Sequence, residues 1–326
     1  MATIGYFLSS EEHPGSELVK AAVLAERAGF RAAWISDHFH PWLEEQGHSP
    51  FVWSVLGGIA AATERLRVTT AVTAPIVRIH PAIIAQAAAT TAELFERCGA
   101  GGTGRFALGL GTGEALNEHI LGDKWPTPEE RLDMLEEAVE IIRTMWEGEV
   151  VDHDGAHYVV ENARLYTLPQ TPPRILLSGF GPKSIQLAAR VADGYITTSP
   201  DGDAIKQYRD AGGKGTLQAG VKVCWHEDKQ QAVKIAHRTW RNSMVPGQLA
   251  QELAMPDFFD QASELVTEDM VAEKVTCGND PEDHVAAIKE YVDAGFDEVY
   301  VAQMGPDQEG MIAFYETEVL PRLSSG

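Results

Sequence analysis

Two strand-like segments of this chain end in side chains that exchange protons. The apolar run Ala32–Ser36 leads directly into Asp37 and His38, and Phe106–Leu108 leads into a glycine turn that ends at Glu114. Glycines let a backbone turn sharply and come close to a ligand where a Cβ atom would collide. A histidine with a carboxylate neighbour and a glutamate beside such a turn could together carry out proton-coupled catalysis.

Each of these features also has a plainer interpretation. His38 could be a buried, hydrogen-bonded core histidine, and Trp42 could pack in the core instead of forming a pocket wall. The Gly109-x-Gly-x-Gly turn could bind nothing. It lacks the glycine spacing of a dinucleotide-binding motif, and no acidic residue ends a strand about twenty residues later, so a Rossmann site is disfavoured.

Three further strand ends carry small or polar residues. Ser178–Lys183 runs from a strand into a helix, where free N–H groups and Lys183 favour an anion such as phosphate. An ordinary capped turn would have the same sequence. Thr197–Ser199 ends the next strand with three hydroxyl groups, placed to bind the same anion, and Thr70–Pro75 offers small residues against which a flat ring could pack.

Strand-like and helix-like segments alternate along the chain, which predicts a (β/α)8 TIM barrel with insertions. Function then lies at the carboxyl ends of the strands. A doubly wound sheet with a second domain would need a central linker, and none is evident. The predicted strands are Thr3–Leu8, Ala32–Ser36, Leu66–Val72, Phe106–Leu108, Arg174–Leu177, Gly194–Thr197, Gln218–Cys224 and Glu298–Gln303.

Two segments interrupt this alternation. Residues 150–165 read as a hairpin that turns at Asp154-Gly155, and about 243–270 form a second insertion within helix-like sequence that spans Gln230–Asp269. We therefore expect residues 1–326 to form one barrel domain that carries both insertions.

Bulk properties limit the classes of partner. The chain has 326 residues, 44% of them hydrophobic, and a formal net charge of −22, which disfavours nucleic acid and anionic membranes. Three distant cysteines without CxxC spacing predict reduced thiols, a cytoplasmic location and no metal site. No apolar run approaches the length of a membrane span, and no signal peptide is visible.

Four segments in this order make the chain resemble the coenzyme F420-dependent branch of the bacterial luciferase-like superfamily. They are Ser36–Trp42, Gly111–Glu118, Gly179–Lys183 and Thr197–Ser199. The nearest likeness is to the F420-dependent glucose-6-phosphate dehydrogenase family, and it extends over nearly the whole chain. It implies a luciferase-like barrel, a homodimer, and hydride transfer between a sugar, sugar phosphate or other secondary alcohol and C5 of a deazaflavin.

The resemblance also implies residue roles. His38 would take the hydroxyl proton, Glu114 would act as an acid at the deazaflavin, and Trp42 would stand beside the reacting carbon. Ala71-Val72 matches a non-proline cis peptide that supports the ring. The cofactor contacts expected from the motifs and from the resemblance together are Asp37, Ala71, Val72, Ala74, Asn117, Ser178, Gly179, Phe180, Gly181, Pro182, Lys183, Thr198 and Ser199.

The expected phosphate-binding positions depart from the family pattern. They are occupied by Asp201, Ala250, Gln251 and Lys274, of which only Lys274 is basic. A doubly charged phosphate needs several basic partners, so an uncharged sugar or another secondary alcohol becomes the more favoured substrate. Trp42, Gln251 and Lys274 are the expected substrate contacts. An FMN-dependent monooxygenase and a non-catalytic deazaflavin-binding homologue remain alternatives.

Overall fold

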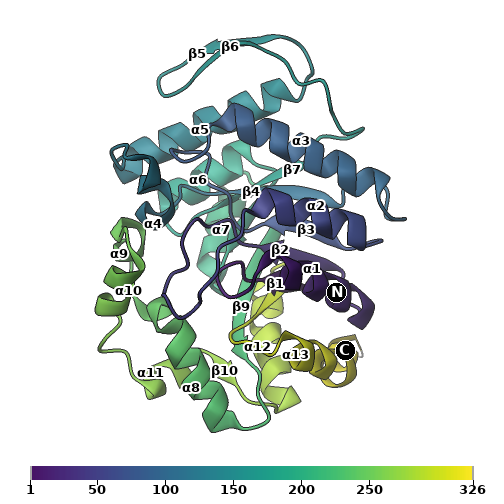
Figure 1. The fold of residues 1–326 in the computed structure, drawn as a ribbon, viewed down its shortest axis with the longest axis vertical. Helices are drawn as coiled ribbons and strands as arrows, with labels where there is room; N and C mark the ends of the chain where they lie inside the picture. Colours follow the sequence, from purple (N-terminus) through teal and green to yellow (C-terminus); the bar gives the residue numbers. More distant parts are fainter. Residues whose placement is uncertain (1, 325–326) are drawn as a thin grey trace.

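The computed structural model describes residues 2–324 and shows a closed barrel of eight parallel strands (Figure 1). The strands follow one another around the barrel in chain order, and pairing of β8 with β9 closes the ring. The predicted (β/α)8 fold is confirmed. The barrel strands are β1 (Thr3–Leu8), β2 (Ala32–Ile35), β3 (Arg67–Thr70), β4 (Phe106–Leu110), β7 (Arg174–Ser178), β8 (Gly194–Thr197), β9 (Thr216–Cys224) and β11 (Glu298–Gln303).

Helices surround this barrel and connect its strands. The most regular is α5, which opens with a capping box at Thr127 and has Pro128 at its first position. Helix α7, which the sequence did not indicate, is short and polar, and Asp201 caps it. The connecting helices are α1 (Gly15–Ala28), α2 (Val52–Ala62), α3 (Pro81–Arg97), α4 (Ala115–Glu118) with η1 (His119–Leu121), α5 (Pro128–Met145), α6 (Pro182–Val191), α7 (Gly202–Asp210), α12 (Pro281–Ala294), and α13 (Gln308–Phe314) with η3 (Tyr315–Val319) and α14 (Leu320–Ser324).

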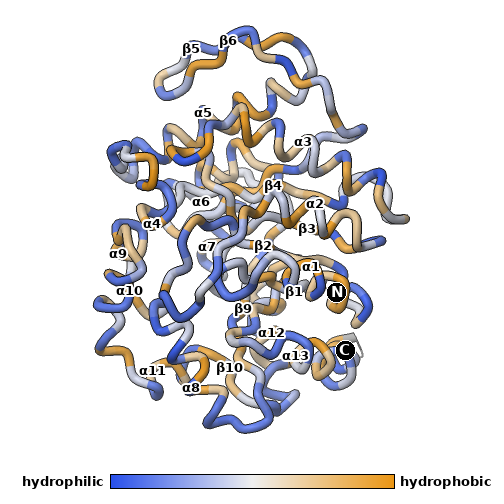
Figure 2. Tube along the Cα trace, in the orientation of Figure 1, coloured by the Kyte–Doolittle hydropathy of each residue, from blue (hydrophilic) through white to orange (hydrophobic). Residues whose placement is uncertain are grey.

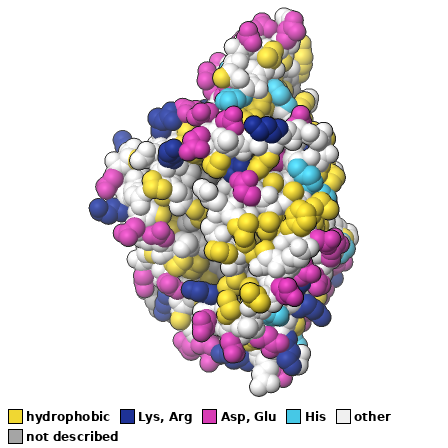
Figure 3. Space-filling view, turned by 90° about the vertical axis from the view of Figure 1, so that its left-hand side faces the viewer, with side chains coloured by type: hydrophobic (Ala, Val, Ile, Leu, Met, Phe, Trp, Pro, Cys, Tyr) yellow, Lys and Arg dark blue, Asp and Glu magenta, His cyan; other side chains and the backbone are white. Residues whose placement is uncertain are grey.

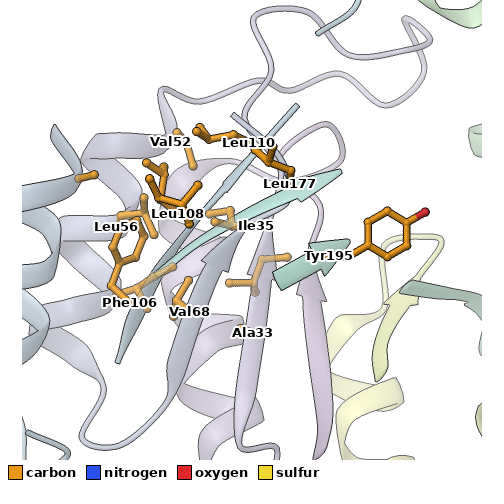
Figure 4. Packing of buried hydrophobic residues seen from close by; sticks show 14 of the residues in the cluster. Ala33, Ile35, Val52, Leu56, Val68, Phe106, Leu108, Leu110, Leu177 and Tyr195 are labelled. Atoms are coloured by element: carbon orange, nitrogen blue, oxygen red, sulfur yellow. The ribbon is translucent and has the colours of Figure 1, made fainter. Parts of the chain in front are cut away.

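The strands bury side chains on both faces, because one face lines the barrel and the other meets the helices. On β2, Ala33 and Ile35 belong to the outer core and pack near Leu56 of α2 (Figure 4). Ala32 and Trp34 belong to the inner cluster, where the Trp34 ring stacks on Tyr300 with centroids 4.4 Å apart. This alternation assigns Ser36 and His38 to the inward row, beyond Trp34 at the carboxyl end. Figure 2 shows hydrophobic residues along the central strands.

The first insertion is an antiparallel hairpin of β5 (Val151–Asp154) and β6 (Val159–Ala163), beside α5 at the top of Figure 1. Its turn end is attached to α5 and to a barrel loop: His153 Nε2 lies 3.0 Å from Glu137 Oε1, and the Tyr158 hydroxyl donates to the carbonyl of Pro75. That carbonyl belongs to the loop after β3, so the hairpin supports a loop of the predicted site.

The helix-like sequence around the second insertion forms several short helices instead of one long one. They are α8 (Lys229–Trp240), η2 (Arg241–Met244), α9 (Leu249–Glu252), α10 (Pro256–Ala262) and α11 (Glu268–Ala272). A two-residue strand that the sequence did not reveal, β10 (Thr276–Cys277), then pairs with the end of β9. No described helix has the length and apolar character needed to cross a bilayer.

Candidate active site

The predicted site residues follow the carboxyl ends of five barrel strands. Asp37 and His38 follow β2, residues 71–74 follow β3, Glu114 and Asn117 follow β4, the turn 178–183 follows β7, and Thr198 follows β8. Strand ends of one parallel barrel meet at one end of it, where the sites of such barrels lie.

His38 is held beside a carboxylate that sequence analysis missed. Its Nδ1 lies 3.2 Å from the carbonyl of His40, and because a carbonyl only accepts, this hydrogen bond assigns the ring proton to Nδ1. Its Nε2 lies 3.4 Å from Glu11 Oε1, and both side chains are at least nine-tenths buried. The hydroxyls of Ser9 and Ser36 donate to the other oxygen of Glu11. The arrangement leaves Nε2 able to accept a proton beside a negative charge.

Asp37, the sequence neighbour of His38, does not orient the imidazole. The Thr73 hydroxyl donates to one of its oxygens at 2.8 Å, and Arg78 Nη2 lies 2.9 Å from the other. Asp37 therefore does not fix the tautomer of His38. Glu11 is the adjacent carboxylate instead, because neighbouring residues at a strand end point in different directions.

Arg78 also faces a second buried carboxylate, Glu118, with Nε 3.5 Å from Oε1. The backbone N–H groups of Val77 and Arg78 donate to the other Glu118 oxygen. Burial raises the pKa of Glu118, while the Arg78 charge opposes that rise. Asp37, Arg78 and Glu118 thus form a buried network that fixes the loops after β2, β3 and β4. Neither Arg78 nor Glu118 stood out in the sequence.

Asn117 connects the two proton-exchanging segments. Its side-chain oxygen accepts from the N–H of Phe39 at 2.8 Å and from that of His40 at 3.2 Å. Its amide nitrogen lies 3.5 Å from Glu114 Oε2. The structure therefore ties Glu114 to the loop that carries His38.

Trp42 joins His38 to the second insertion. Its ring lies 4.9 Å from the His38 ring and 5.1 Å from that of Phe259 in α10, centroid to centroid. Gln251 accepts from the buried Arg131 at 3.0 Å. Lys274 is exposed after α11, and within residues 2–324 its side chain forms no ion pair. Figure 3, which faces the α4, α9 and α10 side of the molecule, shows hydrophobic side chains across its middle among scattered acidic ones.

The loops after β3 and β4 place backbone without large side chains at the carboxyl end of the barrel. The Ala71-Val72 peptide bond is cis, in agreement with the resemblance. A Cβ atom on Gly111 would lie 2.6 Å from Val72 Cγ2, and one on Gly113, whose φ is +71°, would lie 2.9 Å from the Ala74 side chain. Only glycine fits at these two positions, and together the loops offer a surface of small residues.

The turn after β7 is held by a hydrogen bond from Tyr195, and its backbone has free space next to Gly181. The Tyr195 hydroxyl donates to the carbonyl of Gly179 at 2.6 Å, and a Cβ atom on Gly181 would have no neighbour within 4 Å. Phe180 and Ser199 are exposed. Lys183 does not accompany these residues: it pairs with Glu129 of α5 at 3.1 Å on the outer helical face.

Comparison with known proteins defines the class to which this arrangement belongs. Residues 2–298 match the family model of the luciferase-like monooxygenases, so the chain belongs to that family. Within it, the chain is 36% identical to the F420-dependent glucose-6-phosphate dehydrogenase of Microbacterium testaceum, with 98% of this chain and 96% of that protein covered. It is 34% identical to the enzyme of the same name from Nocardia farcinica, with 98% and 97% covered.

A solved structure gives the same picture of the fold. An F420-dependent secondary alcohol dehydrogenase in complex with an F420-acetone adduct superposes with a TM-score of 0.89 at 28% identity, with 98% of each chain covered. The F420-dependent tetrahydromethanopterin reductase of Methanopyrus kandleri, at 22% identity and a TM-score of 0.77, shares the fold.

Proposed function

We propose that the protein is a coenzyme F420-dependent oxidoreductase that interconverts a CH–OH group and a carbonyl. Two relatives are named F420-dependent glucose-6-phosphate dehydrogenase, and a structural neighbour is named an F420-dependent secondary alcohol dehydrogenase. The observation that carries the proposal is the pairing of His38 Nε2 with Glu11 at the barrel end where Asn117 holds Glu114.

The residues present fit a deazaflavin. The glycines after β4 and the cis peptide after β3 leave a surface without protruding side chains, against which a flat ring can lie. We assign ring contacts to Asp37, Ala71, Val72, Ala74 and Asn117. The open backbone at Gly181 and the hydroxyls of Thr198 and Ser199 suit the anionic part of the cofactor. The remaining proposed contacts of that turn are Ser178, Gly179, Phe180 and Pro182, whereas Lys183, which pairs with Glu129 on the outer face, is not among them.

The protein side of the chemistry follows from the site. Bound F420 supplies a hydride acceptor or donor at C5 of its ring. His38 accepts the hydroxyl proton at Nε2, since its own proton is committed to the His40 carbonyl. Glu11 stabilises the imidazolium that results, and Glu114 exchanges a proton at the ring. Trp42 bounds the substrate side next to His38, and Gln251 and Lys274 are the other proposed substrate contacts.

Titration of the purified protein with F420 and, separately, with FMN tests this proposal. We expect F420 to bind and to lose its oxidised absorbance when a secondary alcohol or sugar is added. Tight FMN binding with oxygenation in the presence of an external reductase would favour the monooxygenase alternative. Tight F420 binding without turnover of any alcohol would favour the non-catalytic alternative.

Three finer features belong to the same proposal. We infer that residues 1–326 act as one domain, that two copies form a homodimer, and that the protein works in the cytoplasm on a small-molecule substrate. Three free cysteines support the reducing compartment. Light scattering of the purified protein measures the subunit number directly.

A further inference from the structure

Three polar side chains, linked to His38 through Glu11 and Trp42, have no part in the proposed chemistry. They are Lys222 on β9, Trp240 at the end of α8 and Glu12 after β1, and we call them the polar subsite. They lie close together: the Lys222 ammonium is 5.3 Å from the Trp240 ring centroid, and a Trp240–Glu12 interaction lowers the proton affinity of Glu12.

Lys222 belongs to the inward row of β9. Two residues before it, a Cβ atom on Gly220 would lie 2.8 Å from Trp34, and the Gln218 amide oxygen accepts from the indole N–H of Trp34. Lys222 therefore faces the barrel one step closer to its carboxyl end. Its partner in the parallel register is Ala302, whose side chain is small.

The polar subsite contains polar atoms without partners. Trp240 is 7% exposed, and its Nε1 faces the Glu12 carboxyl but forms no well-aligned hydrogen bond with any described residue. Glu12 Oε1 accepts from the N–H of Gly305 at 2.9 Å, but the buried Oε2 forms no well-aligned hydrogen bond within residues 2–324. Over residues 2–324, the Lys222 ammonium forms neither a hydrogen bond nor an ion pair. Buried donors and acceptors are normally satisfied, so this set is suited to a ligand.

The polar subsite adjoins the catalytic histidine. The charge of Glu11, which contacts His38, is also felt by Lys222. Trp42, whose ring lies against His38, packs with the cluster that contains Trp240. A substrate whose carbinol meets His38 would thus present its next atoms to this group.

The chemistry of the unpaired atoms favours a hydroxyl group over a phosphate. Trp240 and Lys222 donate and the free Glu12 oxygen accepts, whereas a phosphate dianion offers only acceptors. Glu11 and Glu12 would repel an anion. The charge that acts on Lys222 is the negative charge of Glu11, so among the described residues Lys222 has no neighbouring cation to help it bind a phosphate. Burial lowers the pKa of Lys222 to about 8 and raises that of Glu12 to about 7, so near neutral pH Lys222 stays mostly protonated as a donor while Glu12 is only partly charged.

We propose that Lys222, Trp240 and Glu12 bind a second hydroxyl group of an uncharged polyol substrate, next to the carbinol that His38 deprotonates. This inference rests on the proposed function and names its substrate class. It assigns discrimination among alcohols to a set of residues separate from those that move the proton.

Steady-state kinetics of the F420-loaded protein with 2,3-butanediol and 2-butanol test the inference. We expect kcat/KM to favour the diol by at least about tenfold, because a site that bonds a hydroxyl leaves polar groups unpaired with the analogue that lacks it. Trp240→Phe, which removes only the N–H donor, and Lys222→Met should each bring that ratio toward one. Trp225→Phe is the matched control: its Nε1 also lacks a partner, but its ring lies against Phe314.

Two outcomes would overturn the inference. One is an equal kcat/KM for diol and alcohol, or a ratio that Trp240→Phe leaves unchanged. The other is a preference for glucose 6-phosphate over both, abolished by Lys222→Met, which would make the group an anion site. Calorimetric titration with 2,3-butanediol separates this test from the proposed function: diol binding that Trp240→Phe weakens, without turnover, supports the subsite and contradicts the dehydrogenase activity.

Discussion

The two halves of the barrel end are built differently. After β1 to β4, charged side chains are buried and joined to one another: Asp37 and Glu118 have no exposed side-chain surface, and Arg78 between them is 7% exposed. After β7 to β9 and in the second insertion, Thr198, Ser199 and Lys274 are exposed. The buried, paired charges of the first half can hold reacting groups in a fixed geometry. The exposed side chains of the second half can be replaced at little cost in stability. We infer that the first half determines the reaction and the second the substrate.

The largest effect on stability is expected from Arg78→Met. It would leave two buried carboxylates without their cation, which costs about 3–5 kcal/mol in the free energy of unfolding. Guanidinium unfolding measures this loss. Arg190→Met is the control, because the Arg190–Glu136 pair is exposed and worth at most about 1 kcal/mol. Equal losses of unfolding free energy in Arg78→Met and Arg190→Met would contradict the idea that the first half is held by its buried charges.

Glu11→Gln tests whether the carboxylate beside His38 serves the chemistry. Loss of its charge should lower kcat/KM roughly ten- to hundredfold, since the imidazolium formed at His38 loses its partner. F420 affinity should stay the same, which fluorescence titration checks. The matched control is Glu17→Gln on the exposed face of α1. Wild-type kinetics in Glu11→Gln would refute the role of the pair.

Glu12 predicts a specific dependence of stability on pH. Its folded pKa is raised by burial from 4.5 to about 7, so the folded protein holds this proton more tightly than the unfolded chain. Its contribution is therefore lost as pH rises from about 4.5 through 7. Glu12→Gln, which can still accept from the Gly305 N–H, should gain stability relative to wild type between pH 5 and pH 8, on the order of 1–3 kcal/mol. A difference that is constant across this range would contradict the assignment.

The smallest effect is expected from Lys274→Ala. Because this side chain is exposed, kcat/KM for an uncharged alcohol should change by less than about threefold. A loss confined to glucose 6-phosphate would sharpen the comparison, since it would place phosphate selectivity in the variable half. A tenfold loss of kcat/KM with an uncharged alcohol would contradict the expectation that exposed Lys274 does not affect uncharged substrates.

Sequence analysis recovered the barrel because its strands are buried on both faces and appear as short apolar runs between helices. The polar helix α7 and the two-residue strand β10 carry no such pattern, and both were missed. His38 and Glu114 could be found because each directly follows a strand. Glu11 could not, because 26 residues lie between it and His38 and the pairing of β1 with β2, which ends at Leu8 and Ile35, brings their loops together.

His38→Ala is the variant that tests the central assignment most directly. The measurement is the rate at which oxidised F420 absorbance is lost when loaded protein is mixed with a secondary alcohol, alongside F420 affinity by titration. With the proton acceptor removed, we predict unchanged affinity and a rate lower by roughly 10²–10⁴-fold. A variant that reduces F420 as fast as the wild type would contradict the assignment of His38 as the base.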